Sequence, residues 1–269
     1  MNSEFEEYNR DTNPYPCSGK QYNGEYAVIS LTSWKARINT VSKTLYSLIK
    51  QCPGFHIVLV LSEEEFPQKE KELPENLMVF VENELIELLW AKLNLKPHKK
   101  YFYTMQKYRN VPIITCDDDV IILKNFADIL YKSYLANPNF IHAGRCHEII
   151  LLNHKIQSYK KWIFNQKNYN KPSHKLFATG VGGVLYPPNI LNITDADIPL
   201  IKELLTVDDI FLKIKELTLN IKVNSVNLLD FKQYFYDISN KNGLWLNNLN
   251  GKSLNDFYIK KFNHLFINL

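Results

Sequence analysis

The stretch "VPIITCDDDVIIL", from Val111 to Leu123, places three consecutive carboxylates between two apolar runs. Asp117, Asp118 and Asp119 follow a segment with the pattern of a buried strand. Adjacent like charges at a strand end repel one another and resist desolvation, so they cost stability unless a cation or hydrogen-bond donors compensate them. Two interpretations are open: hard oxygen ligands for a divalent metal, or solvated acids that cap the next helix.

Strand and helix patterns alternate on both sides of this stretch. Apolar runs typical of buried strands occupy residues 26–32, 56–62, 77–82 and 111–116, with one or two more strands within 139–150. Helical spacing predicts helices at residues 40–51, 98–110, 125–138 and 206–217. Thr40 is a plausible N-cap, and three acids after Ser62 predict a short helix there. The expected fold class is α/β, with a mostly parallel sheet, helices on both faces and ligands at the carboxyl ends of the strands.

Composition shifts divide the chain into three parts. Residues 1–24 are polar, contain Pro and Gly, and are expected to form an N-terminal arm. Residues 25–223 carry the α/β pattern, and residues 224–269 form a C-terminal extension. Within the α/β unit, Asn153 to Lys175 shows weak periodicity and is expected to be a long insertion or flap.

The overall composition is that of a globular chain. Its 269 residues are 45% hydrophobic and 13% aromatic, which is enough to bury a full-sized core. The net charge of +4 is mildly basic and lacks the concentrated basic stripe of a dedicated nucleic-acid binder. We therefore expect no nucleic-acid partner.

The cysteines and the chain start favour a reducing, cytoplasmic setting. Cys17, Cys52, Cys116 and Cys146 are scattered without zinc spacing, and the last three lie beside apolar runs, as buried free thiols do. The first residues lack the pattern of a cleaved signal, and no apolar stretch is long enough to span a bilayer.

Four motifs give the sequence a resemblance to a known family. "VISLTSWKARINTV", "ITCDDDVI", "TGVGGVLYPP" and "TVDDIF" stand in the order seen in bacterial GT-A-fold glycosyltransferases, particularly family-2-like enzymes that build capsule and lipopolysaccharide glycans. The resemblance spans roughly Tyr26 to Val223 and implies a Rossmann-like catalytic domain. The sequence departs from family 2 in lacking a recognisable Gln-x-x-Arg-Trp motif, which leaves the acceptor class open.

The resemblance implies which residues face the nucleotide. Thr32, Ser33 and Arg37 follow the first strand and resemble the nucleotide-facing loop, where Arg37 would reach the base or the diphosphate. Lys99 and Lys100 match a basic position before the Asp-x-Asp strand that would contact the nucleotide. For Arg37 and both lysines, a solvated surface position is the alternative.

The Asp triplet resembles the Asp-x-Asp motif of these enzymes. Asp117 matches the carboxylate that contacts the ribose, Asp119 the one that holds the metal, and Asp118 lies between and would support either. We assign Asp119 and Asp117 to a Mn²⁺ or Mg²⁺ ion that bridges the donor diphosphate and stabilises the charge that develops as the sugar leaves. On this view the ligand compensates the triplet.

The later two motifs imply the sugar site and the base. Gly180, Gly182 and Gly183 offer backbone that a sugar ring can approach, or form a glycine-rich turn without function. Asp209, with Asp208 as second candidate, occupies the place of the acid that deprotonates the acceptor in similar inverting enzymes. Helix capping is the alternative for one of the pair.

Other side chains near the triplet carry weaker signals. His142, Arg145 and His147 lie just beyond the triplet, and the two histidines with Glu148 would complete a metal shell or hold the acceptor, although a histidine in a strand is more often a core residue. Packing is the default for the tryptophans that could stack on sugar rings, Trp34, Trp162 and Trp245.

The predicted function is a metal-dependent glycosyltransferase that moves a sugar from a UDP-sugar to a glycan or lipid-linked glycan acceptor of the bacterial surface, with inversion. One alternative is a nucleotidyltransferase acting on a sugar phosphate. Such an enzyme would require a glycine-rich phosphate loop early in the chain, and "SLTSWKAR" contains no glycine. The other is a non-catalytic glycan- or calcium-binding module, which would leave the nucleotide-side residues unexplained.

The tail from Lys252 to Leu269 has helical amphipathicity. Apolar residues expected on one face are Leu254, Phe257, Tyr258, Phe262, Leu265 and Phe266. This face either docks on the catalytic domain or holds the enzyme peripherally on the cytoplasmic side of the inner membrane, where lysines would meet anionic lipid.

Overall fold

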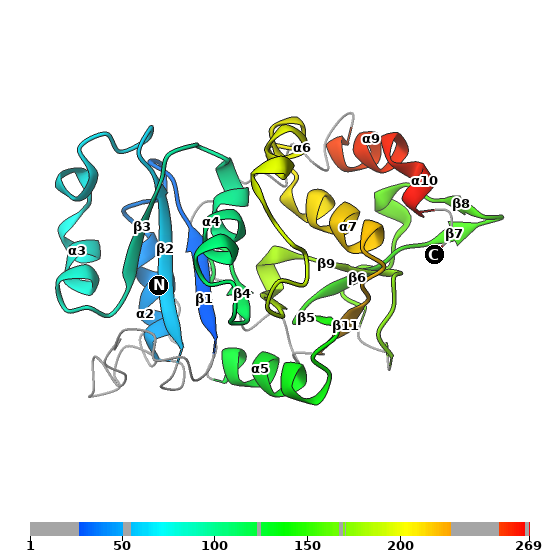
Figure 1. The fold of residues 1–269 in the computed structure, drawn as a ribbon, viewed down its shortest axis with the longest axis horizontal. Helices are drawn as coiled ribbons and strands as arrows, with labels where there is room; N and C mark the ends of the chain where they lie inside the picture. The colour runs from blue at the N-terminus through cyan, green and yellow to red at the C-terminus, as the bar shows by residue number, and fades with distance from the viewer. Residues whose placement is uncertain are drawn as a thin grey trace.

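A computed structural model describes residues 27–50, 55–122, 125–166, 169, 171–226, 253–266 and 269 (Figure 1). The predictions on the N-terminal arm, Cys17, Cys52 and Trp245 lie outside the described residues.

A central sheet organises the described part of the chain. It has seven strands in the order β11-β5-β10-β4-β1-β2-β3. The strands are β1 (Val28–Thr32), β2 (His56–Ser62), β3 (Glu87–Ala91), β4 (Ile113–Thr115), β5 (Ile141–Ala143), β10 (Val184–Tyr186) and β11 (Val223–Ser225). All neighbouring pairs are parallel except those of β10, which runs antiparallel to both β4 and β5. The expected mostly parallel sheet is confirmed.

Helices cover both faces of this sheet (Figure 1). The helices are α2 (Val41–Ile49), α3 (Glu75–Glu82), α4 (Lys99–Lys107), α5 (Phe126–Ala136), α6 (Ile198–Glu203), α7 (Asp208–Thr218), α9 (Leu254–Lys261) and α10 (Asn263–Phe266). One core joins α2, α3 and α5 to strand residues such as Ile29 and Leu59. The alternate strand residues, such as Val28 and Val58, face the side that carries α4.

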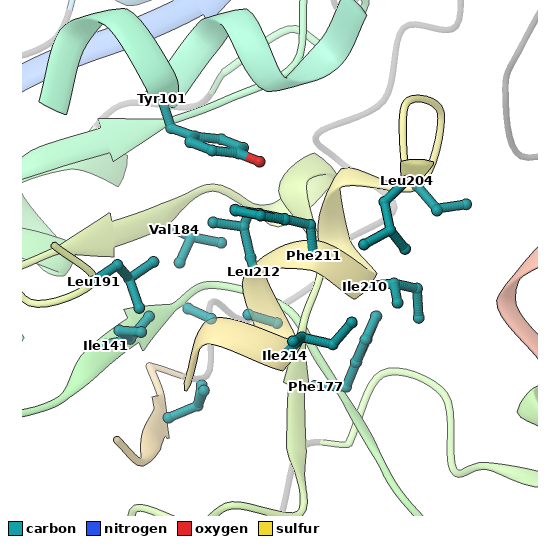
Figure 2. Close-up of a cluster of buried hydrophobic side chains, with 14 of the residues drawn as sticks. Tyr101, Ile141, Phe177, Val184, Leu191, Leu204, Ile210, Phe211, Leu212 and Ile214 are labelled. Atoms are coloured by element: carbon teal, nitrogen blue, oxygen red, sulfur yellow. The ribbon is translucent and has the colours of Figure 1, made fainter. Parts of the chain in front are cut away.

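A second core lies between α4 and α7. Figure 2 shows Tyr101 of α4 facing Phe211 of α7, and the two rings stack with centroids 6.0 Å apart. Ile210 and Ile214 of α7 are buried in the same cluster. This packing fixes the first turn of α4 relative to the first turn of α7.

Short elements complete the described part. Two small sheets pair β6 (Cys146–Glu148) with β9 (Leu176–Ala178) and β7 (Leu151–Leu152) with β8 (Lys155–Ile156). The 3₁₀ helices are η1 (Lys69–Glu72), η2 (Lys96–His98), η3 (Tyr159–Lys161), η4 (Gly180–Gly182) and η5 (Asp195–Asp197).

Two local predictions are wrong. The run at residues 77–82, expected as a strand, lies in α3, because only Leu77 and Phe80 are buried, at helical spacing. The third parallel strand is β3, which the sequence analysis missed. Ser62 ends β2 instead of starting a helix, and residues 63–65 form a turn.

The expected insertion is partly packed. Tyr159 and Trp162 are buried against Phe177, so these two residues anchor the segment to the second core. The expected domain boundary at residue 223 falls at the first residue of β11, which is part of the central sheet.

The C-terminal helices dock on this core. Ile259 and Phe266 are buried in it, and the Tyr258 hydroxyl donates to the Glu203 carbonyl at 2.6 Å. The predicted apolar face is wrong in part, because Phe257 is 60% exposed while Ile259, outside the predicted set, is buried. Among the described residues, no helix combines the length and hydropathy needed to cross a membrane.

Candidate active site

The sheet topology brings the sequence motifs to one edge. The loop after β1 begins at Ser33, and the Asp triplet follows the end of the parallel neighbour β4. β10 is antiparallel to β4, with Val184 opposite Thr115, so Gly180 to Gly183 precede β10 at the same edge. α4 leads back to β4 and α7 to β11, which places the first turn of each helix at this edge as well. This is the carboxyl edge, where ligands bind in such sheets.

Arg37 compensates two members of the triplet. Its Nη1 lies 2.8 Å from Asp118 Oδ1 and 2.8 Å from Asp119 Oδ2, and Ser33 Oγ donates to Asp118 Oδ2 at 2.6 Å. Thr44, which the sequence analysis did not single out, donates to the Asp118 carbonyl at 2.9 Å. Burial would lower the pKa of Arg37, but Asp118 and Asp119 outweigh it and raise that pKa, so the guanidinium stays charged.

Lys100 compensates the third member. Its Nζ lies 2.7 Å from Asp117 Oδ1 and 2.9 Å from Asp208 Oδ2, and its side chain is only 5% exposed. The expectation that the ligand compensates the triplet is therefore incomplete, because Arg37, Lys100 and Ser33 already pair with all three acids. Asp118 is buried, whereas the side chains of Asp117 and Asp119 are 30% and 25% exposed.

The pKa values of the two acids at the start of α7 are shifted in opposite directions. Burial alone would raise the pKa of Asp208, but the Lys100 ammonium outweighs it and the pKa is lowered. Burial, followed by repulsion from Asp208, raises the pKa of Asp209 to about 8. The backbone N–H of Gly180 donates to Asp209 Oδ1 at 3.1 Å. Asp209 is thus an acid whose conjugate base is stronger than an ordinary aspartate.

The three glycines have different surroundings. A Cβ on Gly180 would lie 2.9 Å from Lys100 Nζ and 3.2 Å from Asp117 Oδ1, so this residue borders the acids directly. The Cβ positions of Gly182 and Gly183 are instead filled by Arg145 and Phe126. Gly183 also has φ of 70°, a conformation that favours glycine.

Several predicted site residues point elsewhere. The Thr32 hydroxyl donates to the Val60 carbonyl at 2.7 Å within the sheet. Lys99 is buried and donates to Glu65 at 3.0 Å and Asn94 at 3.2 Å. His142 is fully buried and hydrogen-bonded to Ser133, the ordinary core role that the sequence left open.

The strand beyond the triplet contributes one residue near the acids. Arg145 follows β5, and burial lowers the pKa of its guanidinium although Tyr159, Asp209 and Asp117 act in the opposite direction. His147 is buried and packs on Phe164, with ring centroids 4.4 Å apart. The other tryptophans differ in exposure: Trp162 is buried, and Trp34 is 39% exposed in the loop after β1. The expected free thiols are confirmed for Cys116 and Cys146, both buried.

The triplet contains carboxylates of the kind that hold a divalent ion. Among the described residues no cluster of three or more His, Cys, Asp or Glu is arranged to hold a metal. Mg²⁺ and similar ions are commonly held by one or two carboxylates plus substrate phosphates and water. Asp117 and Asp119, both partly exposed, provide such a set.

Comparisons with known proteins agree with the fold. No family model and no curated protein matches the chain. S. aureus TarS 1–349 matches with a TM-score of 0.52 and 13% identity over 79% of this chain, and the same fragment was solved with UDP and with UDP-GlcNAc. GalNAc-T7, solved with UDP, GalNAc and Mn²⁺, matches with a TM-score of 0.51 and 12% identity over 77% of this chain.

The chain covers only 60% of the TarS fragment and 43% of GalNAc-T7. At these identities the likeness concerns the fold: the protein has the mixed α/β GT-A fold of glycosyltransferases.

Proposed function

We propose that the chain is a glycosyltransferase that takes its sugar from a nucleotide-sugar donor, with residues 25–223 as the catalytic unit. One observation carries the proposal. Acids from the end of β4 and the start of α7, about ninety residues apart, meet around Lys100 at the carboxyl edge of the sheet. The solved structures of TarS with UDP and UDP-GlcNAc support a UDP-sugar as donor.

The donor side of the site is the loop after β1 and the triplet. The Nε of Arg37 is buried without a hydrogen-bond partner among the described residues, which leaves a charged donor for the base or diphosphate. Asp117 is partly exposed and is proposed to contact the ribose. Ser33 orients the triplet through Asp118 instead of touching the nucleotide.

We assign Asp119 and Asp117 to a Mn²⁺ or Mg²⁺ ion, a choice supported by the Mn²⁺ in the GalNAc-T7 structure. When bound, such an ion supplies positive charge to the diphosphate as it leaves.

Asp209 acts as the base. Its carboxylate takes the proton of the acceptor hydroxyl while that oxygen bonds to the anomeric carbon. The bond from this carbon to the diphosphate breaks, and its electron pair leaves with the diphosphate. Because the attack comes from the face opposite the leaving group, the anomeric configuration inverts. The proton ends on Asp209, whose raised pKa favours holding it.

The acceptor is a glycan or lipid-linked glycan of the bacterial surface, as the motif order implies. A peripheral membrane contact would use α9, where Phe257 is 60% exposed beside the exposed Lys260. Co-sedimentation with anionic vesicles tests this contact. The protein should pellet with the vesicles, and a protein that stays in the supernatant makes no such contact.

Turnover of a nucleotide-sugar panel tests the proposed function. UDP release from at least one UDP-sugar, with product NMR showing the inverted anomer, is the expected result. Release of pyrophosphate from a nucleoside triphosphate and a sugar phosphate would instead indicate a nucleotidyltransferase. Calcium or glycan binding without any turnover would indicate a binding module.

A further inference from the structure

Lys100 lies where a lysine is costly. It is in the first turn of α4, where the helix dipole disfavours a cation, and its side chain is 5% exposed. A buried ammonium must be paired to be tolerated. The partners are Asp117 at 2.7 Å and Asp208 at 2.9 Å, which come from two different elements.

The backbone around Lys100 is held as firmly as its side chain. Its carbonyl accepts hydrogen bonds from Ser30 Oγ at 2.5 Å and Thr104 Oγ1 at 2.8 Å. The next residue, Tyr101, stacks on Phe211 of α7, two residues from Asp209 (Figure 2). Lys100 therefore bridges β1, β4 and α7 at one point.

We propose that Lys100 is a positioning residue that ties the donor-side acid Asp117 to the acid pair of α7, and so fixes the base relative to the donor sugar. This inference rests on the proposed function. In this role Lys100 does not make the nucleotide contact expected from the sequence, because its ammonium lies between Asp117 and Asp208.

Gly180 completes the bridge. Any side chain at this position would place a Cβ 2.9 Å from Lys100 Nζ and 3.5 Å from Asp209 Oδ1. The same residue donates its N–H to Asp209 at 3.1 Å. A substitution here would displace the ammonium without removing its charge, which gives an independent way to disturb the bridge.

The experiment compares three variants by UDP-sugar hydrolysis, calorimetric titration with UDP, and thermal unfolding. Lys100→Met removes the bridge, and Gly180→Ala displaces it. Lys213→Met is the matched control, because Lys213 is also buried and paired, with Glu216 at 3.0 Å, outside the acid cluster.

We expect kcat to fall roughly 10²-fold in Lys100→Met and at least about tenfold in Gly180→Ala, since small displacements of reacting groups have effects of this size. The Kd for UDP should change less than about fivefold, which separates positioning from a binding role. Lys213→Met should lower Tm and keep kcat within about threefold when assayed below its Tm.

Three results would overturn the inference. They are an unchanged kcat in Lys100→Met, a Kd for UDP that weakens while kcat is kept, and an equal kcat loss in Lys213→Met. If Lys100→Met does not fold, Gly180→Ala decides by the same criteria. If the wild type neither binds UDP nor turns over any donor, the proposed function itself fails and this inference falls with it.

Discussion

At the scale of single residues, the acid pair of α7 carries the proposed chemistry. Asp208 and Asp209 are adjacent and half-buried, and the Lys100 ammonium favours ionisation of Asp208, its direct partner. The negative charge on Asp208 then adds to burial in raising the pKa of Asp209. A carboxylate with a pKa near the working pH is suited to general-base catalysis.

The pH dependence of activity follows from this arrangement. Asp209 must be deprotonated to act as base, and its pKa in the free protein is about 8. We expect kcat/KM to rise with pH and level off above about pH 8, because kcat/KM reports the free enzyme. Asp209→Asn should abolish the rise of kcat/KM with pH and lower kcat roughly 10²-fold or more, with the Kd for UDP little changed. A variant that loses UDP affinity instead would move Asp209 to a binding role.

The sequence located the side chains that meet at this edge better than it predicted which of them form ion pairs with one another. The order of the motifs located Arg37, Lys100, the triplet and Asp209, and the topology brings these to one edge. Which cation meets which acid depends on how α4 packs on α7, a tertiary contact that no local pattern encodes. For the same reason Lys99 and Lys100, neighbours with the same pattern, have unrelated partners.

At the scale of elements, the errors fall where apolar runs are short. The apolar pattern of residues 77–82 is compatible with a strand and with a helix, because periodicity does not distinguish the two over six residues. The strand that was missed, β3, is at the edge of the sheet, and only Ala91 of its residues is fully buried. The longer patterns of α4, α5 and α7 were predicted correctly.

The glycine-rich turn before β10 gives a prediction at this scale. Gly183→Ala would add a Cβ 2.0 Å from Phe126 Cζ at a residue with φ of 70°. Overpacking and an unfavourable φ together should lower the free energy of unfolding by about 3 kcal/mol, measured by denaturant titration. The loss in Gly183→Ala with Phe126→Ala should be smaller than the sum of the single losses, because the clash is shared. Strict additivity would argue against the contact.

At the scale of the whole molecule, the C-terminal helices pack on the second core of the α/β fold. Phe266 and Ile259 are buried with α7 in the second core, and Asp256 accepts a hydrogen bond from the Tyr159 N–H at 2.6 Å. The sequence pattern predicted one helix here and only part of its buried face, because the chain forms two short helices instead of one continuous helix.

A pair of phenylalanines tests this docking. Phe266→Ala should lower the free energy of unfolding by about 3 kcal/mol, because it removes a fully buried ring. Phe257→Ala is the control and should stay within about 0.5 kcal/mol, since that ring is 60% exposed. Equal effects of the two changes in chemical denaturation would show that the tail does not pack as described.

Calorimetric titration with UDP, in Mn²⁺ and again in excess EDTA, tests most directly the claim that this acid cluster is a nucleotide-sugar site. The wild type should bind UDP in Mn²⁺ and lose at least about tenfold in affinity in EDTA, as expected when a cation that contacts the diphosphate is removed. Asp119→Ala should show the EDTA affinity under both conditions while keeping its fold, because Asp119 is the partly exposed acid assigned to the metal. Failure of the wild type to bind UDP under either condition would contradict the account.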